Sequence, residues 1–222
     1  MPAKKLEAAR SSFLSEKEQL EQIESDKLEY CRSFLELGHE KRLFVKEGEV
    51  LPRRPIGPHT VATLTTEWRA YTMTVWGATY NEGESSTLKA GWIPEMSRDE
   101  EGAKIDPSNE DGLYKGPSRG HVQPEYARLI GMPRSYGYGA TMGAWILDYL
   151  ANWAGEHGWV THSDMKYTGP AHTGDVTYVS GEVTGVDHTQ PDGPVANVAV
   201  RMTNQNEVLM AKGDAQVQLP AP

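Results

Sequence analysis

The residues of this sequence that could do chemistry gather between Lys115 and Gly139. His121 is the histidine of this stretch, and an imidazole gains or loses its proton near neutral pH. Arg119 and Arg134 flank it, and guanidinium groups bind phosphate through paired hydrogen bonds. These cations suit a ligand that carries phosphate groups. Solvated surface positions are the alternative for both arginines.

A glycine-rich turn, SYGYG, leads from this stretch into a helix with almost no polar side, residues 140–154. Three polar residues interrupt it: Thr141, Asp148 and Asn152. A helix that is apolar on every face must be enclosed by protein or lipid. At 15 residues it is too short to cross a bilayer, which needs about 20. We therefore expect a buried helix, with Trp145 in the core or lining a pocket.

For the other polar residues that we considered as site residues, the sequence favours structural roles. Asp148 and Asn152 share one face of the helix, where they line a tunnel or an interface, or face water at its edge. His172 and Asp175 belong to the segment PAHTGD, which is typical of a turn between strands. Two further histidines lack the spacing of metal ligands, and we predict no metal site. They are His157 and His162.

Four strand-like segments follow the helix, at 159–167, 175–187, 194–204 and 207–219. In the last one, Ala215, Val217 and Leu219 alternate with polar residues, as in a strand with one buried face. Asp192 with Gly193, and the stretch 204–206, supply hairpin turns. The pattern predicts an α+β fold in which an antiparallel sheet wraps around a long central helix.

The N-terminal half is less regular. Residues 1–49 are charged and have apolar residues at helical spacing, which predicts a helical extension. Residues 50–58 read as a proline-rich connector, and His59 to Leu64 as a weak first strand. A short helix is expected from Thr65 to about Gly77. We interpret residues 79–120 as an inserted loop, either a flap over a site or a disordered surface loop.

The bulk properties exclude several classes of protein. A formal net charge of −9 gives no general attraction to nucleic acid or to anionic membranes. Cys31 is the single cysteine, so neither an intramolecular disulfide nor a cysteine-rich metal site can form. The N-terminus lacks the apolar core of a secretory signal. We expect a cytoplasmic protein.

Read in order, the C-terminal segments resemble a known family. The run HVQPEYARLIGMPRSYGYG, the helix ending in NWAG, YTGPAHTGDVTYVSGEV and MTNQNEVLMAKGDAQVQLP are similar to the MaoC-like branch of the hot-dog fold, which includes (R)-specific enoyl-CoA hydratases. The resemblance covers residues 121–220, and 50–78 weakly. It implies a hot-dog domain over residues 50–222, preceded by the extension of residues 1–49.

The resemblance also implies a mechanism. In the family, an Asp and a His five positions apart, in a D-x-N-P-x-H-like loop, hold a water and move a proton. A backbone N–H at the start of the hot-dog helix polarises the thioester carbonyl. His121 matches the family's His, and Gly139 matches the helix-start donor. Tyr138 stands where the family often has a His, and is a candidate phenolic donor.

This sequence departs from the family at the carboxylate. Counting five positions back from His121 gives Gly116, and the other alignment, on the segment WGAT, gives Ala78. Neither supplies an acid. Asp106 and Asp111, upstream in the inserted loop, are candidates for a displaced carboxylate.

The expected function is therefore hydration or dehydration of an acyl-CoA thioester, with the CoA ester as substrate and no separate cofactor. The expected catalytic residues are His121, Tyr138 and Gly139, and the expected substrate-binding residues are Arg119, Arg134 and Trp145. The alternative is a non-catalytic hot-dog subunit that binds an acyl thioester or stabilises an active partner; a thioesterase is a weaker third candidate. A homodimer, or a heteromer with another hot-dog chain, is expected because the sheet leaves an open edge.

Overall fold

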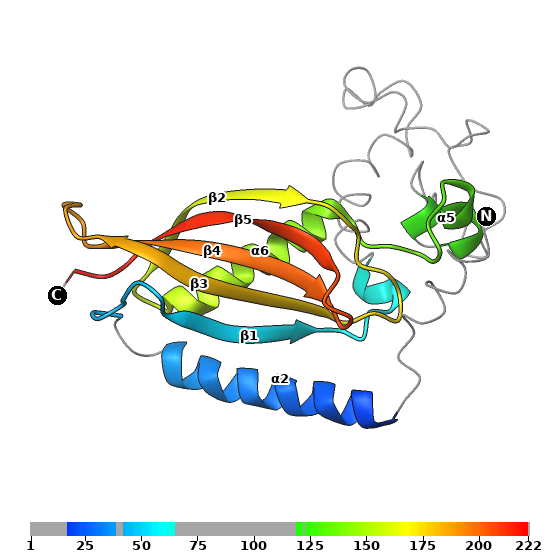
Figure 1. The fold of residues 1–222 in the computed structure, drawn as a ribbon, viewed down its shortest axis with the longest axis horizontal. Helices are drawn as coiled ribbons and strands as arrows, with labels where there is room; N and C mark the ends of the chain where they lie inside the picture. The colour runs from blue at the N-terminus through cyan, green and yellow to red at the C-terminus, as the bar shows by residue number, and fades with distance from the viewer. Residues whose placement is uncertain (1–16, 39–41, 65–118, 122, 222) are drawn as a thin grey trace, which may run out of the picture.

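The computed structural model describes residues 17–38, 42–64, 119–121 and 123–221 (Figure 1). Its helical elements are α2 (Lys17–Gly38), the 3-10 turn η2 (Arg119–His121), α5 (Pro124–Leu129) and α6 (Gly139–Ala154). Its strands are β1 (Val50–Ile56), β2 (Trp159–Tyr167), β3 (Thr177–Asp187), β4 (Val195–Asn204) and β5 (Leu209–Gln218).

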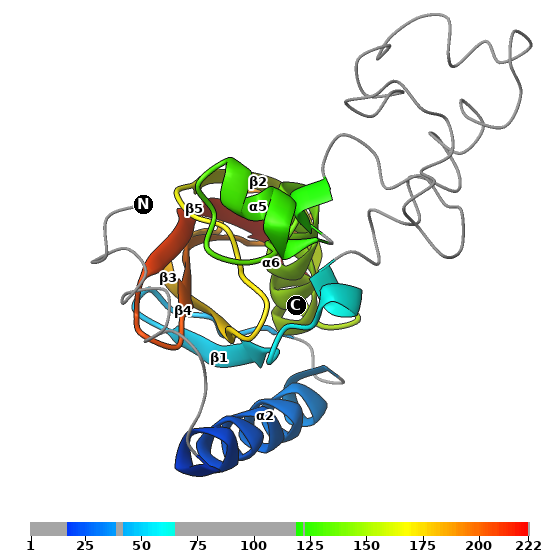
Figure 2. The same ribbon diagram turned by 90° about the vertical axis from the view of Figure 1, so that its right-hand side faces the viewer.

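The five strands form one antiparallel sheet in the order β1-β3-β4-β5-β2. Helix α6 lies along one face of the sheet, and α2 runs beside the edge strand β1 (Figures 1 and 2). The predicted fold class, an antiparallel sheet around a long helix with an N-terminal helix, is confirmed.

The core lies between α6 and the inner face of the sheet. On the helix it is formed by Met142, Ile146, Tyr149, Leu150 and Trp153, each at most 3% exposed. Opposite them lie the inner residues of the strands, among them Val179, Val183, Val198, Val200, Met202, Ala215 and Val217. Burial of these side chains is the main favourable contribution to folding here.

The expectation that α6 is enclosed on every side is corrected. Leu147 is 47% exposed, and its neighbours Ala140, Asp148 and Ala151 are also exposed. An apolar helix in this fold needs only the sheet beneath it and a partial cover along its flanks. The uncovered stripe is short, and Leu147 is the one large apolar side chain among these four exposed residues.

The four C-terminal strands lie where the sequence predicted them, with ends that differ by at most two residues. The hairpin turns are also confirmed, since Gly193 adopts φ 117° and Glu207 adopts φ 58° beside the predicted turn residues. A left-handed φ of this kind is available to glycine without strain.

The prediction for residues 50–64 is wrong. The proline-rich segment is strand β1, paired antiparallel with β3, and residues 61–64 begin a helical turn. Proline is tolerated in β1 because an edge strand has one side whose N–H groups need no partner in the sheet. The regular pairing with β3 is interrupted between Leu51 and Arg54, next to Pro52.

Helix α2 lies within the predicted N-terminal extension. It packs on the molecule through Ile23, which is buried with Val176 and Tyr178, and through Tyr30, whose hydroxyl accepts a hydrogen bond from Asn152. The helix expected at 65–77 and most of the loop expected at 79–120 lie outside the described residues, and the domain boundaries stay predictions. In the part of the chain that the structure describes, no helix is long and apolar enough to cross a membrane.

Candidate active site

A pocket of about 390 Å³ opens at the N-terminal end of α6. This end of the helix lies beside α5 and the end of β2 (Figures 1 and 2). The pocket is lined by His121, Met132, Tyr136, Gly137, Tyr138, Gly139, Met142, Tyr167, Thr168, Gly169 and Pro170. The three predicted catalytic residues, His121, Tyr138 and Gly139, are therefore brought together in one cavity.

The imidazole of His121 has a defined orientation. It is 5% exposed, and its Nδ1 lies 2.7 Å from the backbone oxygen of Tyr136. Since a carbonyl can only accept, Nδ1 carries the proton and Nε2 carries the free lone pair. The rings of Tyr136 and Tyr138 hold the imidazole from two sides, at centroid distances of 4.2 and 5.1 Å.

Burial lowers the pKa of His121, and the hydrogen bond to Tyr136 opposes part of this effect. Desolvation disfavours the imidazolium, so the ring stays neutral at neutral pH. A neutral imidazole with a fixed Nδ1–H and a free Nε2 is a general base.

Gly139 is the first residue of α6, and Tyr138 is its N-cap. The Met142 N–H donates to the Tyr138 oxygen at 3.2 Å, and the N–H groups before it have no partner inside the helix. The side chain of Tyr138 does not cap them. A Cβ added at Gly139 would meet no atom within 4 Å, so this residue lies at an open part of the pocket wall, where the helix dipole favours negative charge.

Two further tyrosines in the pocket were missed by the sequence analysis. Tyr136 comes from the SYGYG turn, and Tyr167 ends β2 and reaches the first turn of α6, where a Cβ at Gly143 would lie 3.0 Å from its hydroxyl. Burial raises the pKa of both phenols, so they stay protonated and act as hydrogen-bond donors. The alternation of Tyr136 with Tyr138 was the available signal for the first.

The PAHTGD segment holds the pocket wall in place. The Gly137 N–H donates to the Ala171 oxygen at 2.7 Å, and the Thr173 N–H donates to the Ser135 oxygen at 3.0 Å. Tyr136 and His172 form an antiparallel bridge. The structural role expected for this segment is to position the turn that carries Tyr136 and Tyr138.

Arg134 is not brought into the pocket. Its side chain is 8% exposed and forms an ion pair of 2.9 Å with Asp175, which is 4% exposed. It also donates to the backbone oxygen of Thr173. The guanidinium is therefore engaged inside the protein, and its role as a ligand for phosphate stays a prediction. The backbone of Arg119 lies in η2, and its side chain, like Lys115, lies outside the described residues.

Trp145 does not line this pocket either. It stacks on His59, with ring centroids 4.9 Å apart and an angle of 1° between the planes. His59 is 3% exposed, and its Nε2 lies 2.8 Å from Thr177 Oγ1. Burial lowers the pKa of His59 to about 4. No local sequence pattern indicates this pair, because its members are far apart in the chain.

Asp148 and Asn152 mark the flank of α6 that α2 and β1 approach. Asp148 pairs with Arg54 of β1, and the Asn152 side-chain N–H donates to the hydroxyl of Tyr30 at 3.4 Å. The side chain of Asp148 is 54% exposed, which agrees with the alternative that this face is close to water rather than a tunnel.

The described lining of the pocket holds no carboxylate. The four positions considered for it, Ala78, Asp106, Asp111 and Gly116, lie outside the described residues. Within the described ranges, no three His, Cys, Asp or Glu side chains cluster in a way that could hold a metal ion.

Solved structures of other proteins share this architecture. The (R)-hydratase from A. caviae involved in PHA biosynthesis aligns with a TM-score of 0.53 at 15% identity, over 79% of this chain and 98% of that one. The ChsH1–ChsH2 complex from Mycobacterium tuberculosis aligns at 0.51 and 14% identity, over 79% and 99% of the two chains. The chain has the hot-dog fold.

A third similar structure is the (R)-hydratase PhaJ1 from Pseudomonas aeruginosa, with a TM-score of 0.51 at 15% identity, over 80% of this chain and 84% of that one. No model of a known protein family and no curated protein matches the sequence. The resemblance to MaoC-like hot-dog proteins therefore rests on the ordered motifs and on these shared folds.

Proposed function

We propose that this protein is a hot-dog hydratase or dehydratase that acts on an acyl-CoA or related thioester. The observation that carries the proposal is one pocket that is lined both by a buried, oriented His121 and by Gly139, the first residue of α6. A base beside bare backbone amides suits a reaction in which a carbonyl gains negative charge.

In the hydration direction, Nε2 of His121 takes a proton from water while the water oxygen bonds to the β-carbon of the enoyl thioester. The thioester oxygen gains the charge of an enolate. The imidazolium then gives its proton to the α-carbon, which completes the addition of water and returns His121 to its neutral form. Dehydration is the same path in reverse.

The enolate oxygen is stabilised by the N–H of Gly139 and by the positive end of the helix dipole. The phenol of Tyr138, which also lines the pocket, is a second donor to this oxygen. Donors that are already in place when charge develops contribute a large part of the catalysis in such sites. The hydrogen bonds from the PAHTGD segment to the turn, which hold Tyr138 and the start of α6 in place, support this part of the proposal.

The second candidate is a non-catalytic hot-dog subunit that binds an acyl thioester or stabilises an active partner. It is favoured by the lack of a carboxylate among the described residues of the pocket. In this case a partner hot-dog chain carries the reaction. A partner of this kind, or a second copy of this chain, would pair at the edge strand β2, whose outer side is unpaired in the described sheet.

The experiment is water addition to a panel of 2-enoyl-CoA esters by the purified protein, followed through the loss of enoyl-thioester absorbance. We expect activity in the parent and a loss of at least about 100-fold in kcat/KM for His121→Ala. His157→Ala, at an exposed position, is the matched control and keeps the parental activity.

Equal activity in the parent and in His121→Ala removes His121 from the mechanism. A parent that binds the esters without turnover, and gains activity only with a second hot-dog chain, supports the subunit instead. Release of free CoA without a hydroxyacyl product identifies a thioesterase.

A further inference from the structure

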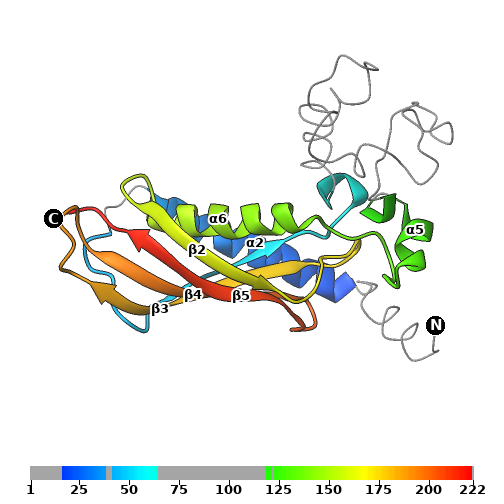
Figure 3. The ribbon, with the colours of Figure 1, turned by 90° about the horizontal axis from the view of Figure 1, so that it is seen from above.

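On the face of the sheet that points away from α6, helix α2 packs only at the start of β3, where Ile23 contacts Tyr178, and no element of the described chain lies over β2, β4 and β5 (Figure 3). A depression of about 450 Å³ lies on this face, lined by residues of β2, β4 and β5. Its polar side chains are charged and exposed. The pocket at the start of α6 uses none of them.

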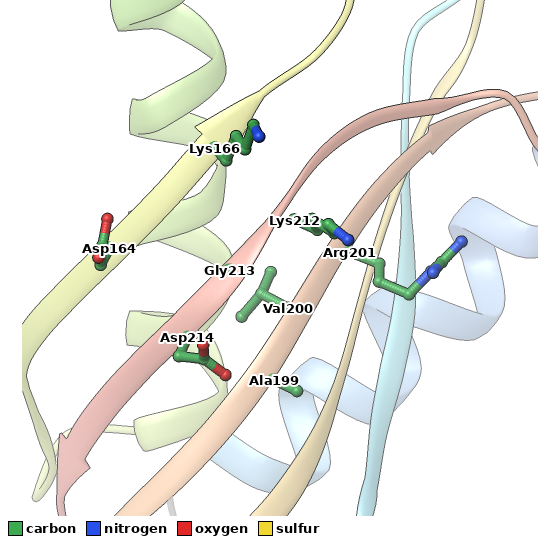
Figure 4. A pocket seen from close by; sticks show the side chains of 8 residues that line it. All are labelled: Asp164, Lys166, Ala199, Val200, Arg201, Lys212, Gly213 and Asp214. Carbon is green, nitrogen blue, oxygen red and sulfur yellow. The ribbon is translucent and has the colours of Figure 1, made fainter.

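The cations of this face form one row across three neighbouring strands. Lys166 of β2 is directly opposite Lys212 of β5, and Lys212 is directly opposite Arg201 of β4. Figure 4 shows the three side chains in a line across the strands. We call these three residues the cation row.

The carboxylates form a second row, two residues further along the strands. Asp164 is opposite Asp214, Asp214 is opposite Ala199, and Ala199 is opposite Glu182 of β3. Figure 4 shows the first three of these in a line beside the cation row. We call Asp164, Asp214 and Glu182 the carboxylate row.

Such rows do not stabilise the isolated sheet. Like charges directly opposite each other on neighbouring strands repel, because their Cβ atoms are only about 5 Å apart. In the part of the chain that the structure describes, no ion pair within 4.0 Å joins the two rows. The charges are therefore arranged for a complement from outside the sheet.

We propose that the complement is a second copy of this chain, docked face to face on the outer side of the sheet. A two-fold axis that lies in the interface, at right angles to the strands and between the two rows, exchanges the rows. Lys166 of one copy then faces Asp164 of the other, and Lys212 faces Asp214. Arg201 faces Ala199, with Asp214 and Glu182 on either side.

A bound polyanion would complement only half of this pattern. It would gain from the cation row, but the carboxylate row lies two residues away, and the whole chain carries a net charge of −9. A second copy satisfies both rows at once, as an isologous interface requires.

The face is large enough for such a contact. The four strands β2 to β5, at about 4.8 Å spacing and with about ten residues of about 3.3 Å each, give a face of about 600 Å². Two such faces together bury about 1,200 Å², which reaches the lower range of stable interfaces. Docked this way, the open edge at β2 stays free for a separate hot-dog pairing.

The test uses two charge-reversed variants of the central strands. Arg201→Glu with Lys212→Glu reverses the cation row, and Glu182→Lys with Asp214→Lys reverses the carboxylate row. Controls with the same change in net charge, at exposed positions away from this face, are Arg32→Glu with Lys46→Glu and Glu36→Lys with Glu47→Lys. Mass is measured by sedimentation velocity at about 0.01 M salt, where the Debye length is about 30 Å.

We expect the parent and both controls to have twice the mass of either reversed variant, and an equimolar mixture of the two reversed variants to recover the parental mass. Three results overturn the proposal. In the first, the parent is no heavier than the reversed variants, and in the second, the mixture of the two reversed variants fails to recover the parental mass. In the third, only reversal of the cation row lowers the mass, which indicates that a bound anion, and not a second copy, complements this face. If a reversed variant does not fold, the neutral variants Arg201→Gln with Lys212→Gln and Glu182→Gln with Asp214→Asn replace it. Each of these should have half the parental mass, and mixing should not restore it.

Discussion

The protonation of His121 is set by two contacts, its burial and its bond to the backbone oxygen of Tyr136. Burial lowers the pKa of the ring below its ordinary value of 6.5. A general base works only when it is neutral, so the rate is lost as pH falls through this lowered pKa.

We therefore expect kcat/KM for enoyl-thioester hydration to be level at neutral pH and to fall only below pH 6.5. The pH profile of the parent measures this directly. His121→Gln, which cannot titrate, should remove that limb of the profile along with most of the activity. If the midpoint of this fall in kcat/KM lies above the ordinary pKa range of histidine, the result contradicts the assignment of His121 as a buried base.

Arg134 and Asp175 form a buried ion pair. We therefore expect a substitution of Arg134 to change the stability of the protein rather than substrate binding. Arg134→Met leaves Asp175 without its charge partner and should lower the free energy of unfolding by about 3–5 kcal/mol. Denaturant unfolding measures the loss. The double variant Arg134→Met with Asp175→Leu should recover part of it, whereas a higher KM at unchanged stability would restore the predicted role in phosphate binding.

The sequence identified the residues of the site that lie close to one another in the chain. The resemblance brought in His121, Tyr138 and Gly139, and the last two stand in the glycine-rich turn that leads into α6. His59 and Tyr167 were missed because their contacts join distant segments. His59 meets Thr177 across 118 positions, and no local pattern encodes such a contact.

At the level of elements, α6 is the helix on which the sheet and the site depend. Ile146 points to the sheet and is 1% exposed, while its neighbour Leu147 is 47% exposed. Ile146→Ala should lower the free energy of unfolding by about 2–4 kcal/mol, because it removes buried methyl groups and leaves a cavity. Leu147→Ala, measured in the same denaturant titration, should lower it by less than about 1 kcal/mol. Equal losses would show that the outer side of α6 is buried in solution.

The strands were predictable where alternation and turn residues agreed, as in β2 to β5. Strand β1 was not, because Pro52 and Pro55 read as a connector. Only the finished sheet, in which β1 lies at an edge, explains why they are tolerated. Likewise, the almost continuous apolar sequence of α6 predicted burial but could not show which stripe stays exposed.

For the whole molecule, His59 couples stability to pH. Burial lowers its pKa from 6.5 to about 4 in the folded protein, so between these values the unfolded chain binds a proton that the folded protein does not. The contribution of His59 to the free energy of unfolding is therefore complete above pH 6.5. It is lost as the pH falls toward about 4, and the loss reaches about 3 kcal/mol. His59→Phe should flatten this part of the curve of unfolding free energy against pH. An unchanged slope in that variant would assign the acid sensitivity to other groups.

The account as a whole rests on one polar feature, the open N–H of Gly139 at the start of α6. Gly139→Pro replaces this donor with the carbon of the proline ring. The helix tolerates the change, since proline suits the first position of a helix and Tyr138 already has the extended conformation, φ −78° and ψ 140°, that must precede a proline. Gly139→Ala keeps the N–H and adds a methyl group with no atom within 4 Å. In enoyl-thioester hydration we expect kcat to fall by about 100-fold or more for Gly139→Pro and to stay within a few-fold of the parent for Gly139→Ala. Equal activity in the two variants would contradict the role of this helix end.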